Sequence, residues 1–382
     1  MSEADKTLSS SLPPSAVIQA AGGKLAQVLL PCEDLAANLD FFVTALGFRV
    51  EAIFPADDPR SAIVSGYGLQ LRLLRTDAAS GAHAAIELTC EQLPEAGPRE
   101  WRAPNGTLVR LVLANPPMRL PPLRPSLAIG KDEGGSHWSV GRAGLRYRDL
   151  IPDRHGGAFI ASHIRVLDGG PVPDYVHYHQ VRFQVIFCRK GWVRVVYEDQ
   201  GPPFVMEAGD CVLQPPTIRH RVLESSAGAE VVEVTAPSEH LTRADSALDL
   251  PTPVLRPDRD FGGQRFVRHQ AALARWQAWR VEGFEVRDTG IADATRGLSG
   301  VRVVRRAAGL ADGTAPQCHA PEFCFYFVLQ GELVLEVDGT QHTLGSNGSA
   351  SLPGGCRYRF ARSSPNVELL EVTLPAEVEV QR

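Results

Sequence analysis

Three histidines stand at spacings that could build a metal site: His177, His179 and His220. The first two lie in the run VHYHQVRFQVIF, which has the composition of a β-strand. Side chains at i and i+2 of a strand point to the same face, so both imidazoles can enter one interior. Imidazoles bind several divalent transition metals, and His220 on a distant strand could complete a facial set of three. The alternative is an interior that keeps the histidines as hydrogen-bonded residues without a metal.

The surrounding residues fit two motifs. The first, with one extra residue after its opening glycine, is matched by Gly170, His177, His179, Gln184 and Gly191. The second is matched by Gly209, Pro215 and His220, with Thr217 in place of a glycine. This pattern resembles the cupin superfamily, in which the position of Gln184 is normally a glutamate. The resemblance implies an antiparallel β-barrel, the cupin double-stranded β-helix, with a metal in its interior.

The resemblance implies one divalent metal per chain held by His177, His179 and His220. Fe(II) is favoured, and Mn, Ni, Cu and Zn are alternatives. Gln184 is either a weak ligand or a hydrogen-bond partner of metal-bound water. Because glutamine is neutral, the double charge of the metal is not compensated, which favours anionic substrates. Arg182 lies two residues before Gln184, and we expect it either to bind a substrate carboxylate or to be a solvent-exposed arginine.

The second half of the chain contains an internal repeat. GLRYRDL at 144 matches GFEVRDT at 283, His179 matches His319, and Glu233 matches Glu371, at offsets of 283 − 144 = 139, 319 − 179 = 140 and 371 − 233 = 138. Each copy alternates apolar and polar residues between Gly, Pro and Asp turns, which is typical of an antiparallel barrel. The second copy has lost most of the motif, with Gln317, His319, Cys324 and Tyr358 at the four ligand positions. A soft metal is conceivable there, but a structural barrel is the favoured interpretation.

The N-terminal region predicts a small α+β domain. The segment QVLLPCEDLAANLDFFVTALGFRV contains an amphipathic helix over 34–48 that ends at Gly47, and PNGTLVRLV predicts a closing strand. These segments resemble the vicinal oxygen chelate superfamily, which includes glyoxalase I and bleomycin-resistance proteins. Gln27 stands where that family usually has its first metal histidine, so the domain is expected to bind a partner or to dimerise rather than to catalyse. A second helix is predicted over 269–284.

The sequence therefore predicts a mainly β protein, with two tandem antiparallel β-barrels behind the small α+β domain. The expected boundaries are a disordered tail at 1–23, the glyoxalase-like domain at 24–115, a Pro-rich linker at 116–136, the first barrel with the metal site at 137–240, a linker at 241–268 and a degenerate second barrel at 269–382.

Composition narrows the function classes. The net charge is −5 with both signs mixed, so no basic stripe for nucleic acid is present. No signal peptide and no apolar run long enough to span a membrane is found, and the seven cysteines are scattered, so a soluble, cytoplasmic protein with reduced thiols is expected. The predicted partner is a small-molecule, anionic substrate, and a homodimer is compatible with the sequence.

Three functions compete. The first is a metal-dependent bicupin enzyme, a dioxygenase that acts on a small organic acid or oxygenated metabolite. The second is a non-enzymatic small-molecule-binding or regulatory protein, which the loss of the acidic ligand at Gln184 supports. The third, a sugar or sugar-phosphate isomerase, would need a phosphate pocket, for which Arg182, Arg219 and Arg221 are the basic residues at hand.

Overall fold

The computed structural model describes residues 25–45, 47–66, 68–76, 85–95, 97–102, 108–132, 137–308, 313–319, 322–378 and 380–381. It separates into two compact units, Met1–Pro55 with Pro59–Met118, and Ala56–Asp58 with Arg119–Arg382. Both copies of the internal repeat therefore belong to one unit. The predicted tail at 1–23 lies outside the described residues.

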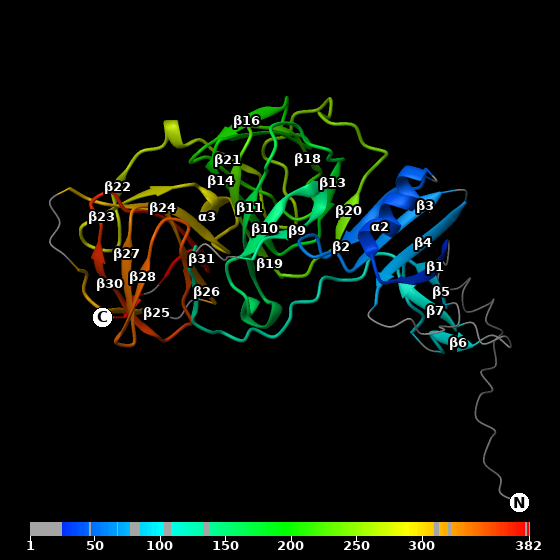
Figure 1. Cartoon of the computed structure of the whole chain (residues 1–382), viewed down its shortest axis with the longest axis horizontal. Helices are drawn as coiled ribbons and strands as arrows, with labels where there is room; N and C mark the ends of the chain where they lie inside the picture. The colour runs from blue at the N-terminus through cyan, green and yellow to red at the C-terminus, as the bar shows by residue number, and fades with distance from the viewer. Residues whose placement is uncertain are drawn as a thin grey trace, which may run out of the picture. The chain divides into compact units, whose positions relative to one another are not determined.

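The N-terminal unit is a twisted sheet with one helical segment, shown in blue and cyan in Figure 1. Its strands follow the order β2-β3-β4-β1-β5-β7-β6. The helix predicted over 34–48 is observed as α2 (Leu35–Asp40) and a π-helical turn η1 (Phe41–Ala45), capped by the Asp34 carboxylate, which accepts from the Ala37 amide at 2.9 Å. The strands are β1 (Leu25–Cys32), β2 (Arg49–Phe54), β3 (Ser61–Gly66), β4 (Leu69–Arg75), β5 (Ala85–Cys90), β6 (Glu100–Arg102) and β7 (Leu108–Leu113).

The first repeat consists of two antiparallel sheets that face each other. One follows the order β21-β17-β14-β19-β11-β10-β9, and the other runs β16-β15-β18-β13-β20 with β12 beside β18. The strands are β9 (Ser139–Val140), β10 (Arg146–Asp149), β11 (Ile160–Arg165), β12 (Gly170–Pro171), β13 (His177–His179), β14 (Phe183–Lys190), β15 (Trp192–Tyr197), β16 (Phe204–Glu207), β17 (Cys211–Leu213), β18 (His220–Ser225), β19 (Glu230–Ala236), β20 (Thr242–Ala244) and β21 (Val267–His269). Two short 3-10 helices are η2 (Arg142–Gly144) and η3 (Arg154–Gly157).

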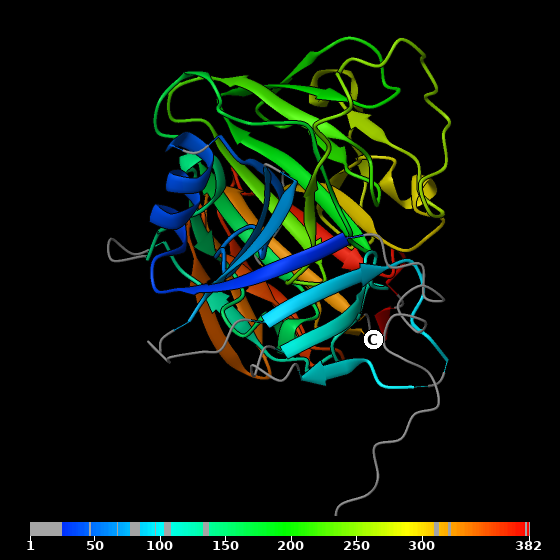
Figure 2. The ribbon, with the colours of Figure 1, turned by 90° about the vertical axis from the view of Figure 1, so that its right-hand side faces the viewer.

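The second repeat has the same arrangement, coloured from yellow to red in Figures 1 and 2 apart from its strand β8. Its sheets follow the orders β22-β23-β24-β31-β26-β29-β8 and β28-β27-β30-β25-β32. The strands are β8 (Ala128–Gly130), β22 (Gln277–Ala278), β23 (Phe284–Asp288), β24 (Gly300–Arg306), β25 (Gln317–His319), β26 (Phe323–Gln330), β27 (Leu333–Val337), β28 (Thr340–Leu344), β29 (Ser349–Ser351), β30 (Arg357–Ser363), β31 (Glu368–Leu374) and β32 (Val380–Gln381). The helices are η4 (Ala271–Leu273) and α3 (Ile291–Ala294).

The mainly β prediction is confirmed, with one correction. Among the described strands, neither repeat closes into a ring, so each is a pair of facing sheets rather than a closed barrel. The strands at the ends of the larger sheets, such as β9 and β22, have only two residues, too few to bridge to the opposite sheet.

The repeats exchange short strands. β21, which precedes the second repeat, pairs with β17 of the first, and β8, which precedes the first repeat, pairs with β29 of the second. These two strands are themselves related by the repeat, at 267 − 128 = 139. The segments predicted as linkers at 116–136 and 241–268 therefore contribute strands to the sheets. Phe261 and Phe266 from the second of these segments also pack in the interior of the first repeat.

The prediction of a helix over 269–284 is wrong. The segment forms η4 and the edge strand β22 instead. Its apolar side chains do not share one face: Leu273 is 76% exposed, Trp276 stacks under the Arg305 guanidinium at 4.0 Å, and Trp279 is buried inside the second repeat. Contacts with the sheets outweigh the local periodicity.

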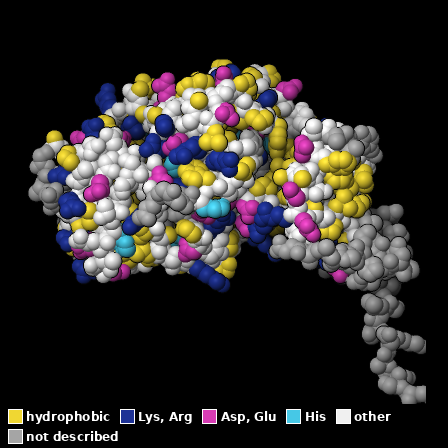
Figure 3. Space-filling view, in the orientation of Figure 1, with side chains coloured by type: hydrophobic (Ala, Val, Ile, Leu, Met, Phe, Trp, Pro, Cys, Tyr) yellow, Lys and Arg dark blue, Asp and Glu magenta, His cyan; other side chains and the backbone are white. Residues whose placement is uncertain are grey.

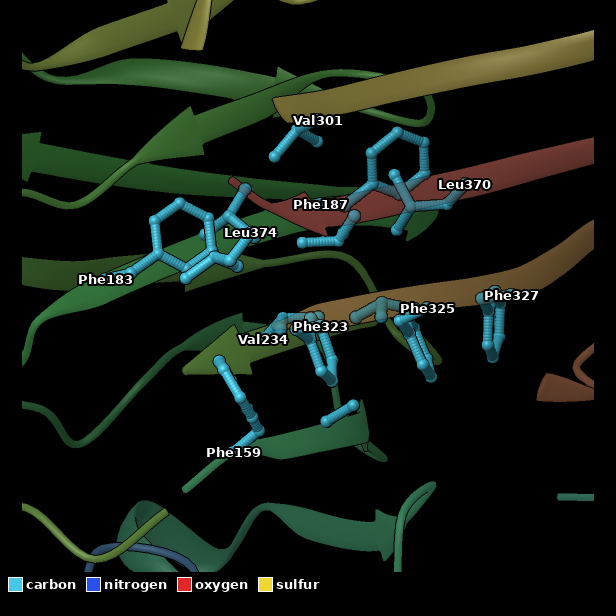
Figure 4. Close-up of a cluster of buried hydrophobic side chains, with 14 of the residues drawn as sticks. Phe159, Phe183, Phe187, Val234, Val301, Phe323, Phe325, Phe327, Leu370 and Leu374 are labelled. Carbon is cyan, nitrogen blue, oxygen red and sulfur yellow. The ribbon is translucent and has the colours of Figure 1, made fainter. Parts of the chain in front are cut away.

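Alternation along the central strands separates two cores. On β14, Phe183 and Phe187 pack against Phe323 and Phe325 of β26, which joins the larger sheets of the two repeats (Figure 4). Gln184 and Ile186, which alternate with them, face the opposite way, into the space between the two sheets of their own repeat, which we call its interior. Gln184 therefore enters the interior of the first repeat.

The surface matches the composition. On the face shown in Figure 3, acidic and basic side chains of the described residues are interspersed, and neither sign of charge forms a large patch. In the described part of the chain, no helix is long and apolar enough to cross a membrane.

Candidate metal centre

Strand pairing brings the three histidines together in the interior of the first repeat. His177 and His179 lie on β13, and His177 is the direct register partner of His220 at the start of β18. All three side chains are buried, and their ligand atoms lie within 4.8 Å of one another. Among the described His, Cys, Asp and Glu residues, this is the one group of three that is close enough to hold an ion.

Each imidazole is oriented through its Nδ1 atom. His177 Nδ1 donates to the Tyr175 carbonyl at 2.8 Å and His220 Nδ1 to the Ile218 carbonyl at 3.0 Å, while His179 Nδ1 contacts the Thr242 hydroxyl at 2.9 Å. A proton on Nδ1 leaves the Nε2 lone pair free to act as a ligand, which is the usual arrangement around metal-binding histidines. The donor set therefore fits a divalent transition metal.

The histidines are neutral at physiological pH. Burial is the largest cause, and it lowers the pKa of His220 to about 4 and holds the pKa values of His177 and His179 well below their usual range. For His177 the neighbouring Arg142 guanidinium adds to the effect. No proton therefore has to leave before a metal binds.

This gives a pH prediction for the metal-loaded protein. Because a lowered pKa means that protons compete for the imidazoles only at lower pH, we expect metal content to stay constant through the ordinary histidine range and to fall as the pH approaches about 4, the lowered pKa of His220. Dialysis against metal buffers at each pH, followed by mass-spectrometric metal analysis, measures this. Half-loss near the ordinary histidine pKa of about 6.5 would contradict it.

Arg142 is a site residue that the sequence did not reveal. Its Nη2 lies 2.9 Å from His177 Nε2, and its Nη1 is ion-paired with the buried Asp174. Burial raises the pKa of Asp174, but the Arg142 charge outweighs this and holds it below the usual range. A metal would take over the contact between Arg142 and His177. Arg142 stands 35 residues before His177, and no motif connects the two.

Glu233 is a second residue that the motifs did not reveal. It is buried on β19 and faces the interior, where its Oε1 accepts from Gln184 Nε2 at 2.9 Å and from the Thr235 hydroxyl at 3.0 Å. Burial raises its pKa. The match of Glu233 to Glu371 in the repeat, a glutamate amid apolar strand residues, was the available signal.

Gln184 lies in a hydrogen-bond chain rather than beside an acidic ligand. Its Oε1 accepts from Gln214 Nε2 at 3.1 Å, and Gln214 Nε2 also lies 3.4 Å from His220 Nε2. The Tyr197 hydroxyl donates to Gln214 Oε1 at 2.6 Å. This series of hydrogen bonds thus connects the Glu233 carboxyl to the His220 imidazole of the candidate metal centre.

The other predicted basic residues lie elsewhere. Arg182 forms a bidentate ion pair with Glu322 of the second repeat and does not line the interior cavity. It precedes β14, so strand alternation with Gln184 does not extend to it. Arg219 is paired with Asp245 at 3.1 Å and stacks on Tyr178, so these residues provide no phosphate pocket in the interior.

The second repeat contains a protein cation where the first has its metal centre. Arg280 is ion-paired with the fully buried Glu371, and its Nη2 lies 3.2 Å from the Tyr326 hydroxyl. Both ring nitrogens of His319 and the Nε2 of Gln317 are buried without hydrogen-bond partners. Burial is the main cause that lowers the pKa of His319 to about 4, with Arg280 adding to it. Cys324 and Tyr358 are buried among apolar side chains.

Comparison with known proteins gives distant structural matches. No family model matches the chain, and no curated protein matches its sequence. The oxalate decarboxylase of Bacillus subtilis superposes with a TM-score of 0.49 at 12% identity, over 66% of this chain and 78% of that protein. The formate complex of the Lactobacillus farciminis oxalate decarboxylase gives 0.49 at 12%, over 66% and 88%. The E. coli protein Ylba gives 0.47 at 11%, over 70% and 97%. These values assign no activity to this chain.

Proposed function

We propose that this chain is a metal-dependent enzyme of the bicupin type, an oxygenase that acts on a small organic acid. The observation that carries the proposal is the convergence of three buried, neutral imidazoles whose Nδ1 atoms are already bound elsewhere. His177, His179 and His220 would hold the metal, with Fe(II) favoured because a facial set of histidines leaves positions open for substrate and dioxygen. A bound metal supplies Lewis acidity and a coordination site for both reactants.

The chain's own residues would bind the substrate and move a proton. In the described lining of the cavity the acids are Asp57 and Glu233, and Asp57 is ion-paired with Arg154 at 2.7 Å. Glu233 has hydrogen-bond partners but forms no ion pair with the other described residues, and burial raises its pKa, so it would be the candidate general acid or base. Arg142 would orient a substrate anion beside the metal.

The test is metal content combined with oxygen uptake. Untagged protein is analysed by mass spectrometry and then reconstituted with Fe(II), and dioxygen consumption is followed with short organic acids. Near-stoichiometric metal and metal-dependent uptake support the proposal. Metal that binds without oxygen uptake would overturn the oxygenase assignment, and protein that binds no metal after reconstitution would overturn the enzyme.

One observation favours a second candidate, a non-enzymatic ligand-binding protein. Arg142 already contacts the Nε2 atom of His177 that a metal would need. In that case an organic anion would bind to the metal-free protein as tightly as to the metal-loaded protein.

For the N-terminal unit we propose a non-catalytic module of the vicinal oxygen chelate type. Gln27 is buried and donates to Gln70, and the neighbouring Glu87 is ion-paired with Arg72 at 3.1 Å. These contacts occupy the polar groups that a metal would need.

A further inference from the structure

The interior of the first repeat contains a cavity of about 110 Å³. One end is polar and is formed by Arg142, His179, Gln184, Gln214, His220 and Glu233. The rest is lined mainly by aliphatic side chains, among them Leu145, Ile164, Ile186, Val193, Val195 and Val222. The described lining includes Tyr147 and Tyr197 but no phenylalanine or tryptophan. The cavity therefore has one polar end and an aliphatic body.

The second repeat shows how this cavity arises. Strand register matches Ile186 to Tyr326, because Ile186 pairs with Glu233 and Tyr326 with Glu371. In the same way, Val222 pairs with Val195 and Phe360 with Leu335. At these two positions the first repeat thus has aliphatic residues where the second has larger aromatic ones.

The aromatic residues fill the interior of the second repeat. The Phe360 ring lies 5.3 Å from Phe284, 5.6 Å from Tyr326 and 6.1 Å from Trp279, measured between ring centroids. All four rings are buried. Since the same fold can pack its interior in this way, the space in the first repeat is a property of its sequence and not of the architecture.

The charges at the polar end select the head of a ligand. Arg142 and Asp174 form an ion pair, and imidazole ligands contribute no negative charge, so Glu233 is the one carboxyl of this polar end without an ion pair among the described residues. A divalent metal at the histidines would therefore carry more positive charge than Glu233 alone could balance, at the polar end of an otherwise apolar cavity, where the low polarity strengthens its attraction for an anion. This step rests on the proposed metal centre.

The volume of the cavity limits the size of the ligand's apolar part. A volume of about 110 Å³ is somewhat smaller than the engineered apolar cavity of about 150 Å³ that binds benzene. A short aliphatic chain fits such a space, whereas a large aromatic ring system does not.

We propose that the first repeat binds an aliphatic carboxylate, with the carboxylate at the metal and Arg142 and the hydrocarbon chain against Ile186, Val195 and Val222. The substrate class is a short-chain to medium-chain aliphatic acid or its oxygenated derivative. A small hydrophilic acid would leave the aliphatic body of the cavity unfilled.

The test measures how affinity depends on chain length. Metal-loaded protein is titrated calorimetrically with acetate, propanoate, butanoate, pentanoate and hexanoate. We expect the affinity to rise about fourfold per added methylene, equivalent to about 0.8 kcal/mol for each buried CH₂. Benzoate, an aromatic anion, is expected to bind more weakly than hexanoate.

Two cavity-filling variants test where the hydrocarbon chain of the ligand lies. Ile186→Phe introduces an aromatic ring at the position of Tyr326 and should weaken hexanoate binding at least tenfold while leaving acetate binding unchanged. Val195→Leu introduces the residue type that the second repeat has at the equivalent position, and it is the milder variant if Ile186→Phe does not fold. In this variant, affinity should stop rising at a shorter acid than in the wild type. Val205→Phe, on the exposed side of β16, is the matched control and should have no effect.

Metal content, measured separately, distinguishes the two proposals. Bound metal with no dependence on chain length, or an equal loss of acetate and hexanoate affinity in Ile186→Phe, would overturn the inference alone. Absence of metal, with the dependence on chain length preserved, would overturn the proposed enzyme and support the aliphatic ligand class.

Discussion

Replacing both His177 and His179 by alanine is expected to reduce bound metal from about one ion per chain to less than about a tenth. Both side chains are buried, and both rings are oriented by contacts through Nδ1. Loss of two of three imidazoles leaves one neutral ligand, which cannot hold a divalent ion against water. Metal analysis by mass spectrometry after purification without an affinity tag measures the effect.

The matched control is His319→Ala. This histidine is equally buried and lies at the equivalent position of the second repeat, but it faces the Arg280 guanidinium region rather than two further imidazoles. We expect wild-type metal content in this variant. Full metal content in the double variant would place the ion elsewhere, and loss of metal in His319→Ala would move it to the second repeat. Circular dichroism of both variants checks that the sheets are intact.

Spacing within single strands carried much of the site prediction. His177 and His179 are two residues apart on a strand, so their common direction follows from the period of the β-strand alone. The second-motif spacing identified His220, and Thr217, which replaces a glycine of that motif, adopts φ 65, the left-handed conformation that a glycine would favour. Local geometry is encoded locally, and this part of the site could be predicted.

Contacts between distant segments could not be predicted. Arg142 reaches the site from η2, and its approach to His177 depends on how the strands of both sheets pack. The exchange of β8 and β21 depends on pairing partners that lie more than fifty residues away in the chain. Arg182 was placed by strand alternation, but it lies just outside β14 and Glu322 draws it to the second repeat. Each of these outcomes is decided by a tertiary contact rather than by local pattern.

Arg142 and Arg280 occupy corresponding positions in the two repeats. Each stands two residues after its edge strand, β9 or β22, and each enters the interior of its own repeat. In the second repeat the guanidinium pairs with Glu371, whereas in the first it pairs with Asp174 and leaves Glu233 without its charge. In one repeat the arginine thus pairs with the strand glutamate, and in the other it pairs with Asp174 beside the three histidines.

Arg280→Met is therefore expected to destabilise the protein strongly. Glu371 is fully buried, and removing its main partner leaves an unpaired buried carboxylate, which costs about 3 to 5 kcal/mol. Arg302, whose Nη1 lies 3.5 Å from Glu371 Oε2, keeps the loss at the lower end of that range. Urea unfolding at neutral pH, followed by tryptophan fluorescence, measures the change in free energy of unfolding.

Two further variants test the cause of that loss. Arg280→Met combined with Glu371→Leu removes both charges and should recover most of the stability, because apolar side chains of similar size can replace a buried ion pair. Arg359→Met, which breaks the solvent-exposed pair with Glu336, should leave the unfolding midpoint unchanged. Burial raises the pKa of Glu371, but Arg280 outweighs it and holds the pKa below its usual range, so the stability from this pair is present near neutral pH and is lost as the pH falls through the lowered value. The difference between wild type and Arg280→Met should accordingly shrink in acid, and a difference independent of pH would show that Arg280 acts through packing rather than charge.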